Sequence, residues 1–196
     1  MQWNRSSCPP DGMRLAGSAI VGTDGDAVLA GLLRGVVADS LAWLGEYPED
    51  QVDAGALAAI RQSLDWLSQQ LQARQGDRLE SGVMDETALK VSAELFVDLS
   101  WWLDTCPDEE VEPNAAVSVL ENGTTFTYEL SDQQRGRLVE VLGEIGAAER
   151  HEGRRHAVCR LPFAIGLVDG EEPECEMPVA REWVRLEDRA DDQAKI

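Results

Sequence analysis

The first half of the chain repeats apolar residues at the spacing of an α-helix. The first such stretch begins after Asp24 or Asp26, either of which can cap a helix, and ends near Leu44. The third runs from Asp85 to the Cys106-Pro107 pair, where proline stops a helix. Together with the stretch between them, these patterns predict three helices before residue 106.

The second stretch has the most regular spacing. Asp53 is its expected N-cap and Gly76 lies at its expected end. Its apolar residues step by three and four, at Leu57, Ile60, Leu64, Leu67 and Leu71. We expect this seam to pack inside the domain, and the alternative is a coiled-coil contact in a helical oligomerisation scaffold.

The most specific local pattern lies in the middle of the chain. Alternating β-forming residues occupy 115–121 and 124–130, with Asn122-Gly123 between them. An Asn-Gly pair in this setting is typical of a two-residue type I′ turn. The pattern therefore predicts a β-hairpin.

The C-terminal part predicts one more helix and two strands. Ser131 is the expected N-cap of a helix to about Glu149, and residues 156–168 and 177–186 are expected to be extended. A short strand near 14–21 is a further option. Three helices, a hairpin, a helix and two strands favour an α+β fold with a small antiparallel sheet.

The 196 residues match one ordinary domain, 1–196. An acidic linker flanked by prolines, 107–113, is the expected subdomain boundary. It would separate a mainly helical part, 1–106, from a hairpin–helix–strand part, 114–190.

The sequence favours a cytoplasmic location. No apolar run approaches the ~18 residues that span a bilayer, and no secretory signal pattern is evident. The four cysteines are scattered, so we expect thiols in a reducing compartment.

Charge is the strongest feature of the composition. There are 37 acidic and 17 basic residues, and the net charge of −20 makes nucleic acids and anionic membranes poor partners. No basic residue lies between Lys90 and Arg135, or between Arg34 and Arg61. Because only two lysines accompany fifteen arginines, the alternative is that the acidity reflects a GC-rich bacterial genome or a salt-rich cytoplasm.

One group of residues resembles the ligand set of a zinc site. Imidazoles and thiolates are the ligands that zinc prefers, and the chain offers them at His151, His156, Cys159 and Cys175. The group lacks a paired C-x2-C element, and neighbouring arginines oppose a cation. A small enzyme or zinc-binding domain centred on His156, Cys159 and Cys175 is thus an alternative function, whereas the arginines of 150–160 are expected to pair with nearby acids.

The leading hypothesis is a non-enzymatic acidic protein that neutralises or chaperones a basic protein partner. Immunity proteins, nuclease inhibitors and nucleic-acid mimics act in this way. No phosphate loop, nucleophile elbow or H-E-x-x-H motif is present, so no catalytic residue is assigned and no cofactor is expected beyond zinc. The predicted binding residues combine acids with aromatic anchors: Trp101, Trp102, Asp104, Asp108, Glu109, Glu110 and Glu112.

Overall fold

The computed structural model describes residues 23–48, 50–76, 84–170 and 182–185 of the chain. These residues form six α-helices and one 3-10 helix, and they include no β-strand. The predicted α+β fold with an antiparallel sheet is therefore wrong for the described part of the chain, which is all-α. The elements are α1 (Thr23–Leu44), α2 (Ala54–Gly76), α3 (Met84–Thr105), α4 (Pro113–Thr124), η1 (Thr125–Glu129), α5 (Asp132–Ala148) and α6 (Glu152–Ala164).

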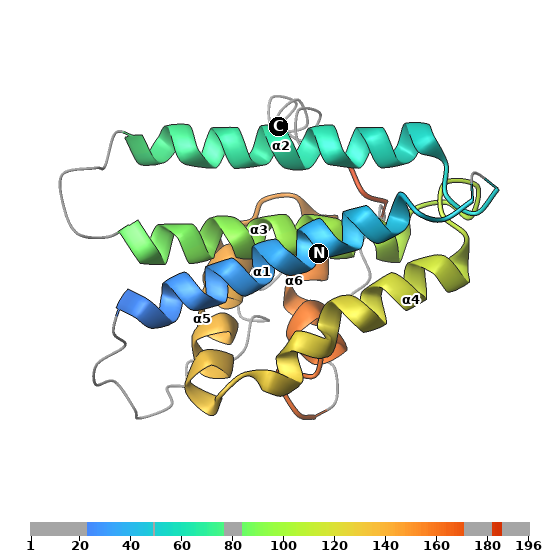
Figure 1. The fold of residues 1–196 in the computed structure, drawn as a ribbon. Helices are drawn as coiled ribbons and strands as arrows, with labels where there is room; N and C mark the ends of the chain where they lie inside the picture. Colours follow the sequence, from blue (N-terminus) through green and yellow to red (C-terminus); the bar gives the residue numbers. More distant parts are fainter. Residues whose placement is uncertain (1–22, 49, 77–83, 171–181, 186–196) are drawn as a thin grey trace, which may run out of the picture.

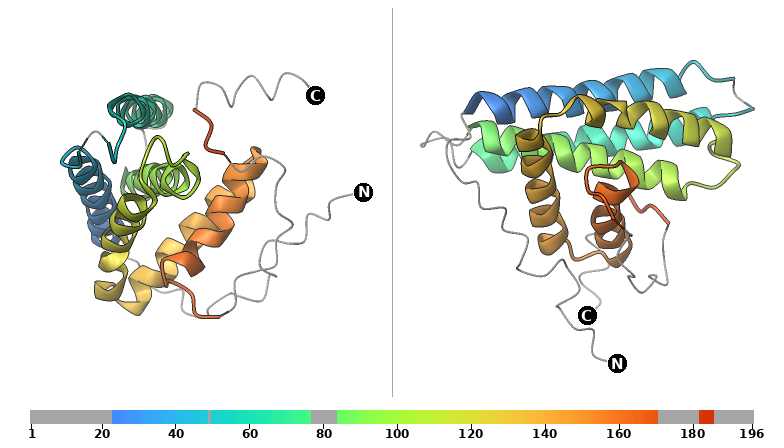
Figure 2. Two further views of the ribbon diagram at one scale, coloured as in Figure 1. Left: turned by 90° about the vertical axis from the view of Figure 1, so that its right-hand side faces the viewer. Right: turned by 90° about the horizontal axis from the view of Figure 1, so that it is seen from below.

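Helix α3 is the centre of the fold. It packs against α1, α2, α4, α5 and α6, and it has its most extensive contact with α1. The long axes of α1, α2 and α3 are roughly aligned, and α5 and α6 run across this layer (Figures 1 and 2). Because α3 is covered on all sides, nearly every side chain from Leu89 to Leu103 is buried.

The three predicted N-terminal helices are confirmed. The Oδ1 atom of Asp53 accepts a hydrogen bond of 2.7 Å from the backbone N–H of Ala56, as expected for an N-cap. The expected cap at Asp26 is not used, because Asp26 lies inside α1 and pairs with Arg137 of α5 at 3.1 Å. This ion pair ties the first turns of α1 to α5.

The regular seam of α2 packs inside the domain. Leu57, Ile60, Leu64 and Leu67 are all buried in the core, and the side chain of Leu71 lies outside the described part. These four side chains are therefore not available to a coiled-coil partner.

The composition of helix α1 also matches that of a membrane-spanning helix. Residues Gly25–Leu44 have a mean hydropathy of 1.6, so this stretch is long and apolar enough to cross a membrane, and the expectation that no run approaches that length is wrong. The core helix of a soluble protein and an N-terminal signal sequence satisfy the same criteria. The cytoplasmic location and the absence of a membrane partner stay predictions.

The predicted β-hairpin at 115–130 is wrong, because this segment forms α4 and η1. The side chain of Glu112 accepts a hydrogen bond from the backbone N–H of Ala115 at 3.1 Å, and Pro113 occupies the first turn, where its missing N–H has no cost. Asn122 and Gly123 lie in the last turn of α4, and the amide of Asn122 donates to the carbonyl of Ser118 at 2.7 Å. The helix thus satisfies locally the polar groups that the hairpin would have placed in a turn.

Replacing Gly123 with alanine distinguishes the two conformations. A Cβ atom at this position would lie 3.4 Å from Ser40 Oγ and 3.5 Å from Val36 Cγ1, within ordinary contact distance. We expect a gain of about 0.5–1 kcal/mol in the free energy of unfolding, measured in urea, because alanine favours a helix over glycine. The exposed Gly143→Ala in α5 is the matched control, with a similar gain. A loss at Gly123 alone would indicate the positive φ of a hairpin turn.

The predicted strand at 156–168 is also wrong, because most of it belongs to α6. Val158, Leu161 and Ile165 are buried at a spacing of three and four residues, which is the helical period. Pro162 lies inside α6, where it cannot donate to the carbonyl of Val158, and the helix ends two residues later at Ala164. Of the strand expected at 177–186, residues 182–185 are irregular, and the rest lies outside the described residues, as does the option near 14–21.

The helix predicted after Ser131 is confirmed. The hydroxyl of Ser131 accepts from the backbone N–H of Gln134 at 3.3 Å, and the Gln134 side chain accepts from the N–H of Ser131 at 3.0 Å. This capping box fixes the start of α5. On both sides of 107–113, residues from all six α-helices contribute to one continuous core.

Candidate functional site: an acidic end and an adjoining groove

The tertiary structure joins two acidic loops that are far apart in the sequence. The α1–α2 loop and the α3–α4 loop meet in an antiparallel bridge between Val52 and Val111. The N–H of Asp53 donates to the carbonyl of Glu110, and the N–H of Glu112 donates to the carbonyl of Gln51, each at 2.7 Å. Both valines are buried, so the neighbouring acidic side chains alternate outward.

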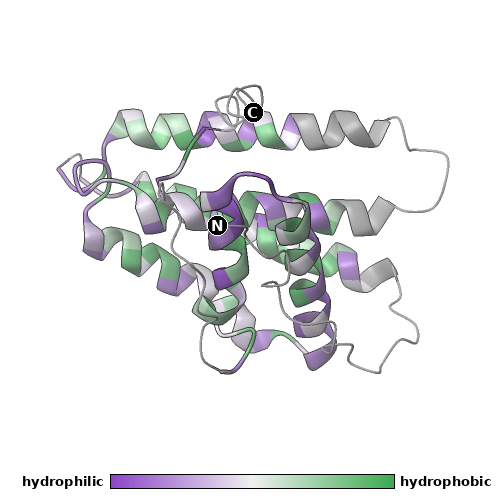
Figure 3. Cartoon of the chain, turned by 180° about the vertical axis from the view of Figure 1, so that it is seen from behind, coloured by the Kyte–Doolittle hydropathy of each residue, from purple (hydrophilic) through white to green (hydrophobic). Residues whose placement is uncertain are grey.

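The two paired loops carry seven carboxylates, and Asp104 at the end of α3 adds an eighth; we call these eight the acidic end. Six are exposed, Glu110 and Glu112 are half-buried, and no ion pair among the described residues involves any of the eight. Two cations of the described part lie nearby: Arg185 lines a cavity together with Asp53 and Glu110, and Arg61 donates to the carbonyl of Leu41 at the end of α1, at 2.7 Å. Both loops contain many hydrophilic residues, drawn in purple in Figure 3. The acidic end consists of Glu46, Asp50, Asp53, Asp104, Asp108, Glu109, Glu110 and Glu112.

The half-buried thiol of Cys106 responds to the negative potential of this end. The pKa of Cys106 is raised to about 11, first by burial and then by the charge of Glu110, with smaller contributions from Asp108 and Asp104. The thiol therefore stays protonated at neutral pH. The charges of Glu110, Asp108 and Asp104 thus act together on this thiol. Glu46, Asp50 and Asp53, which lie in the second stretch without a basic residue, were not among the predicted binding residues.

The expected aromatic anchors are inside the protein. Trp101 is 2% exposed and Trp102 is 1% exposed, so neither projects from the surface as an anchor, although Trp101 lines the floor of the groove between α3, α4 and α6. By contrast, Trp43 in the last turn of α1 is 44% exposed, and its carbonyl accepts the backbone N–H of Glu46 at 2.9 Å. Among the residues that the structure describes, Trp43 is therefore the exposed tryptophan that borders the acidic end. A lone tryptophan near a helix end gave no sequence signal that it would be exposed.

Arg154 pairs within the protein, as expected for the basic segment 150–160. Its guanidinium contacts Asp98 at 3.1 Å and Glu149 at 2.5 Å, and it also bonds to Glu94. Burial acts to lower the pKa of Arg154, but these three carboxylates outweigh it and raise the pKa. This cluster fixes α6 against α3.

The three described residues of the suggested zinc site have different roles. The Nδ1 atom of His151 accepts the N–H of Arg154 at 3.2 Å as the N-cap of α6, and its ring lies 5.4 Å from that of Trp101. Cys159 is half-buried facing Gly146 of α5, whereas His156 lines a groove beside α3. No group of three or more potential metal ligands forms among the described residues, and Cys175 lies outside them. Zinc binding at these residues remains untested.

A groove opens beside the acidic end, between α3, α4 and α6. Both α4 and α6 pack on α3, and the space that they leave has a volume of about 460 Å³. That is within the range of small-ligand pockets. Apolar side chains from all three helices line it, namely Val97, Trp101, Leu120, Ala157, Leu161, Ala164 and Ile165.

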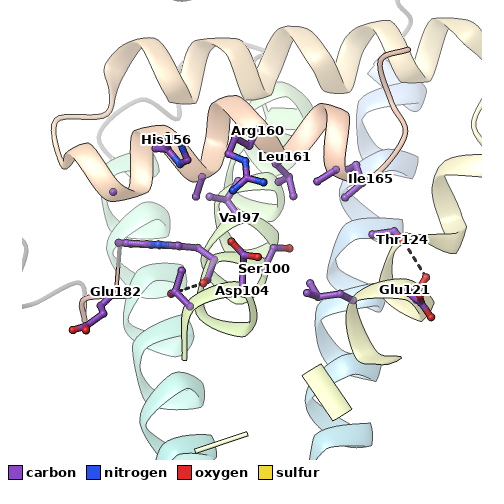
Figure 4. Close-up of a pocket in the computed structure, with 16 residues that line it drawn as sticks. Val97, Ser100, Asp104, Glu121, Thr124, His156, Arg160, Leu161, Ile165 and Glu182 are labelled. Carbon is purple, nitrogen blue, oxygen red and sulfur yellow. Dashed lines mark hydrogen bonds between the residues drawn. The ribbon is translucent and has the colours of Figure 1, made fainter. Parts of the chain in front are cut away.

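Polar residues are unevenly placed around this groove. Arg160 and His156, one turn apart, extend from α6, and Asp104 extends from α3 on the opposite wall (Figure 4). Glu121 of α4 and Glu182 lie at other parts of the rim, and both are exposed. The groove thus combines an apolar lining with three carboxylates, one guanidinium and one imidazole.

Comparisons with known proteins add no relative. The chain matches no protein-family model, no curated protein and no solved structure. What the acidic end and the groove can do therefore follows from their own residues, charges and contacts.

Proposed function

We propose that this protein is a non-enzymatic binding protein that engages a basic protein partner through its acidic end. The observation that carries the proposal is the pairing of two distant acidic loops into one surface of eight carboxylates that form no ion pair with the described residues. Carboxylates in internal ion pairs would have little charge to offer, whereas these keep a net negative charge even though Asp53 and Glu112 also accept hydrogen bonds as helix caps.

Binding would proceed in two stages. The field of the acidic end, within a chain of net charge −20, would attract a basic surface and raise the association rate. Trp43 would then provide the desolvated aromatic contact that holds the complex, since tryptophan is enriched at interface hot spots. Such a protein would neutralise or chaperone its partner.

Charge reversal at Glu109 and Glu110 tests the first stage. The partner is isolated on the immobilised protein from a lysate of the encoding organism and identified by mass spectrometry, and association rates are then measured across a salt series. We expect Glu109→Lys with Glu110→Lys to slow association by about tenfold at low salt and to flatten the salt dependence.

The matched control makes the same charge change elsewhere, with Asp65→Lys and Glu129→Lys, both at exposed positions. It should leave most of the association rate intact. If both variants slowed association equally, the effect would be due to net charge alone. If no basic protein were retained from the lysate and released by salt, the proposal would be contradicted.

Replacing Trp43 with alanine tests the second stage. Loss of a hot-spot aromatic costs about 2 kcal/mol or more, so the dissociation rate of the captured partner should rise by about thirtyfold or more. The association rate should change little, because the carboxylates remain. Trp66→Ala, at a second exposed tryptophan on α2, is the control, and an equal effect there would exclude Trp43 as the anchor.

A further inference from the structure

We propose that the groove between α3, α4 and α6 receives an apolar side chain of the basic partner, flanked by its lysine or arginine residues. This inference rests on the proposed function, because it names the chemistry of the segment that the partner inserts. It also identifies which part of this protein would select among basic partners.

The shape of the groove suits a side chain rather than a flat surface contact. Its volume of about 460 Å³ exceeds that of one large apolar side chain, and its lining comes from three helices. The floor is fixed, because Val97 and Trp101 belong to the buried face of α3. The α6 wall is held by the buried Arg154 cluster. A preformed apolar site of this kind binds without large ordering costs.

The charge of the rim selects a cation. Carboxylates of Asp104, Glu121 and Glu182 border the groove and are exposed, against the single guanidinium of Arg160. An anionic ligand that reached Arg160 would meet three carboxylates and the field of the whole chain. A ligand with an apolar body and flanking positive charges matches both the lining and the rim.

The groove is continuous with the acidic end. Asp104 belongs to both, and Thr105 and Glu182 line both the groove and the neighbouring cavity that contains Asp53 and Glu110. One basic segment can therefore contact the acidic end and place a side chain in the groove. The acidic end would supply attraction, and the groove would supply selectivity.

Short peptides probe the groove without the natural partner. The probe is acetyl-Lys-Leu-Lys-amide, titrated into the ¹⁵N-labelled full chain and followed by amide chemical shifts. Its matched peptides replace leucine with serine or both lysines with glutamate. We expect the leucine peptide to shift amides of α3, α4 and α6 around the groove, the serine peptide to bind about tenfold more weakly, and the glutamate peptide not to bind.

Two variants locate the site. Ala157→Phe places a ring in the groove and should weaken the leucine peptide by about tenfold or more, with an unchanged thermal melt as the folding control. Glu121→Gln removes one rim carboxylate and should weaken binding of the leucine peptide about two- to fivefold. Glu129→Gln makes the same charge change in η1, away from the groove, and should leave that binding unchanged. If Ala157→Phe does not fold, the comparison of Glu121→Gln with Glu129→Gln still tests whether the peptide binds in the groove.

The results separate this inference from the proposed function. The inference would be overturned if the leucine peptide changed amide chemical shifts only outside the groove. It would also be overturned if the serine peptide bound as tightly as the leucine peptide, or if the glutamate peptide bound more tightly. Capture of a basic partner that depends on Glu109 and Glu110 would leave the proposed function standing in that case. Conversely, the leucine peptide could bind in the groove while no basic protein is captured. That result would refute the proposed function and show that the groove binds cationic ligands for a different function.

Discussion

Replacing Arg154 with leucine is expected to lower the free energy of unfolding by about 3–5 kcal/mol, because it leaves a buried group of carboxylates without their cation. The side chain of Arg154 is 5% exposed and that of Asp98 is 4% exposed, so solvent cannot replace the lost ion pairs. Glu94 and Glu149 are only slightly more exposed. Urea unfolding followed by circular dichroism measures the change.

The neighbouring Arg150→Ala is the control. Arg150 is exposed, and its replacement should change stability by less than about 0.5 kcal/mol. Similar losses in the two variants would mean that the Arg154 cluster is not the feature that stabilises α6.

The dependence on pH gives a second check of this cluster. Burial acts to raise the pKa of Glu149, but the charge and hydrogen bond of Arg154 and the N–H groups of His151 and Arg150 outweigh it, so the pKa is lowered from 4.5. A lowered folded-state pKa stabilises the protein above the unfolded-state value, and this contribution is lost as pH falls through the folded-state pKa. The difference between wild type and Arg154→Leu should therefore shrink below about pH 4.

Replacing Trp102 with alanine is expected to cost about 3–5 kcal/mol, since it removes a large buried side chain from the core. Trp102 is 1% exposed and lies on α3, which all the other α-helices cover. Urea unfolding again gives the value.

Trp66→Ala is the matched control. Because Trp66 is 38% exposed, its replacement should lower the free energy of unfolding by no more than about 1 kcal/mol. If Trp102→Ala kept full stability and instead weakened the capture of a basic partner, Trp102 would be an anchor, as the sequence analysis expected, and its burial here would not describe the free protein.

The helices of the first half were predictable because their signals are long and agree with one another. In α2, the seam from Leu57 to Leu67 repeats over several turns, and Asp53 caps it through its own side chain. The capping box of Ser131 and Gln134 is equally local. Such signals need no distant residue to be satisfied.

The hairpin and strand predictions failed because short segments are decided by their surroundings. β-forming residues flank Asn122-Gly123, yet Glu112 and Pro113 begin a helix just upstream, and α1 lies close enough to Gly123 to pack on it. In α6, the buried ion pairs of Arg154 with α3 favour the helix over an extended segment. Propensity over a few residues is too weak to oppose such tertiary contacts.

For the candidate site, the sequence by itself determined the charge, the stretches without a basic residue and the caps that begin the helices. Only the tertiary structure decided that Val52 pairs with Val111, which brings two acidic loops together, and that Trp43 rather than Trp101 or Trp102 is exposed. It also decided that α4 and α6 leave a groove over α3. The physical reason is that charge and capping are properties of neighbouring residues, whereas burial and the pairing of loops depend on which distant helices share the core.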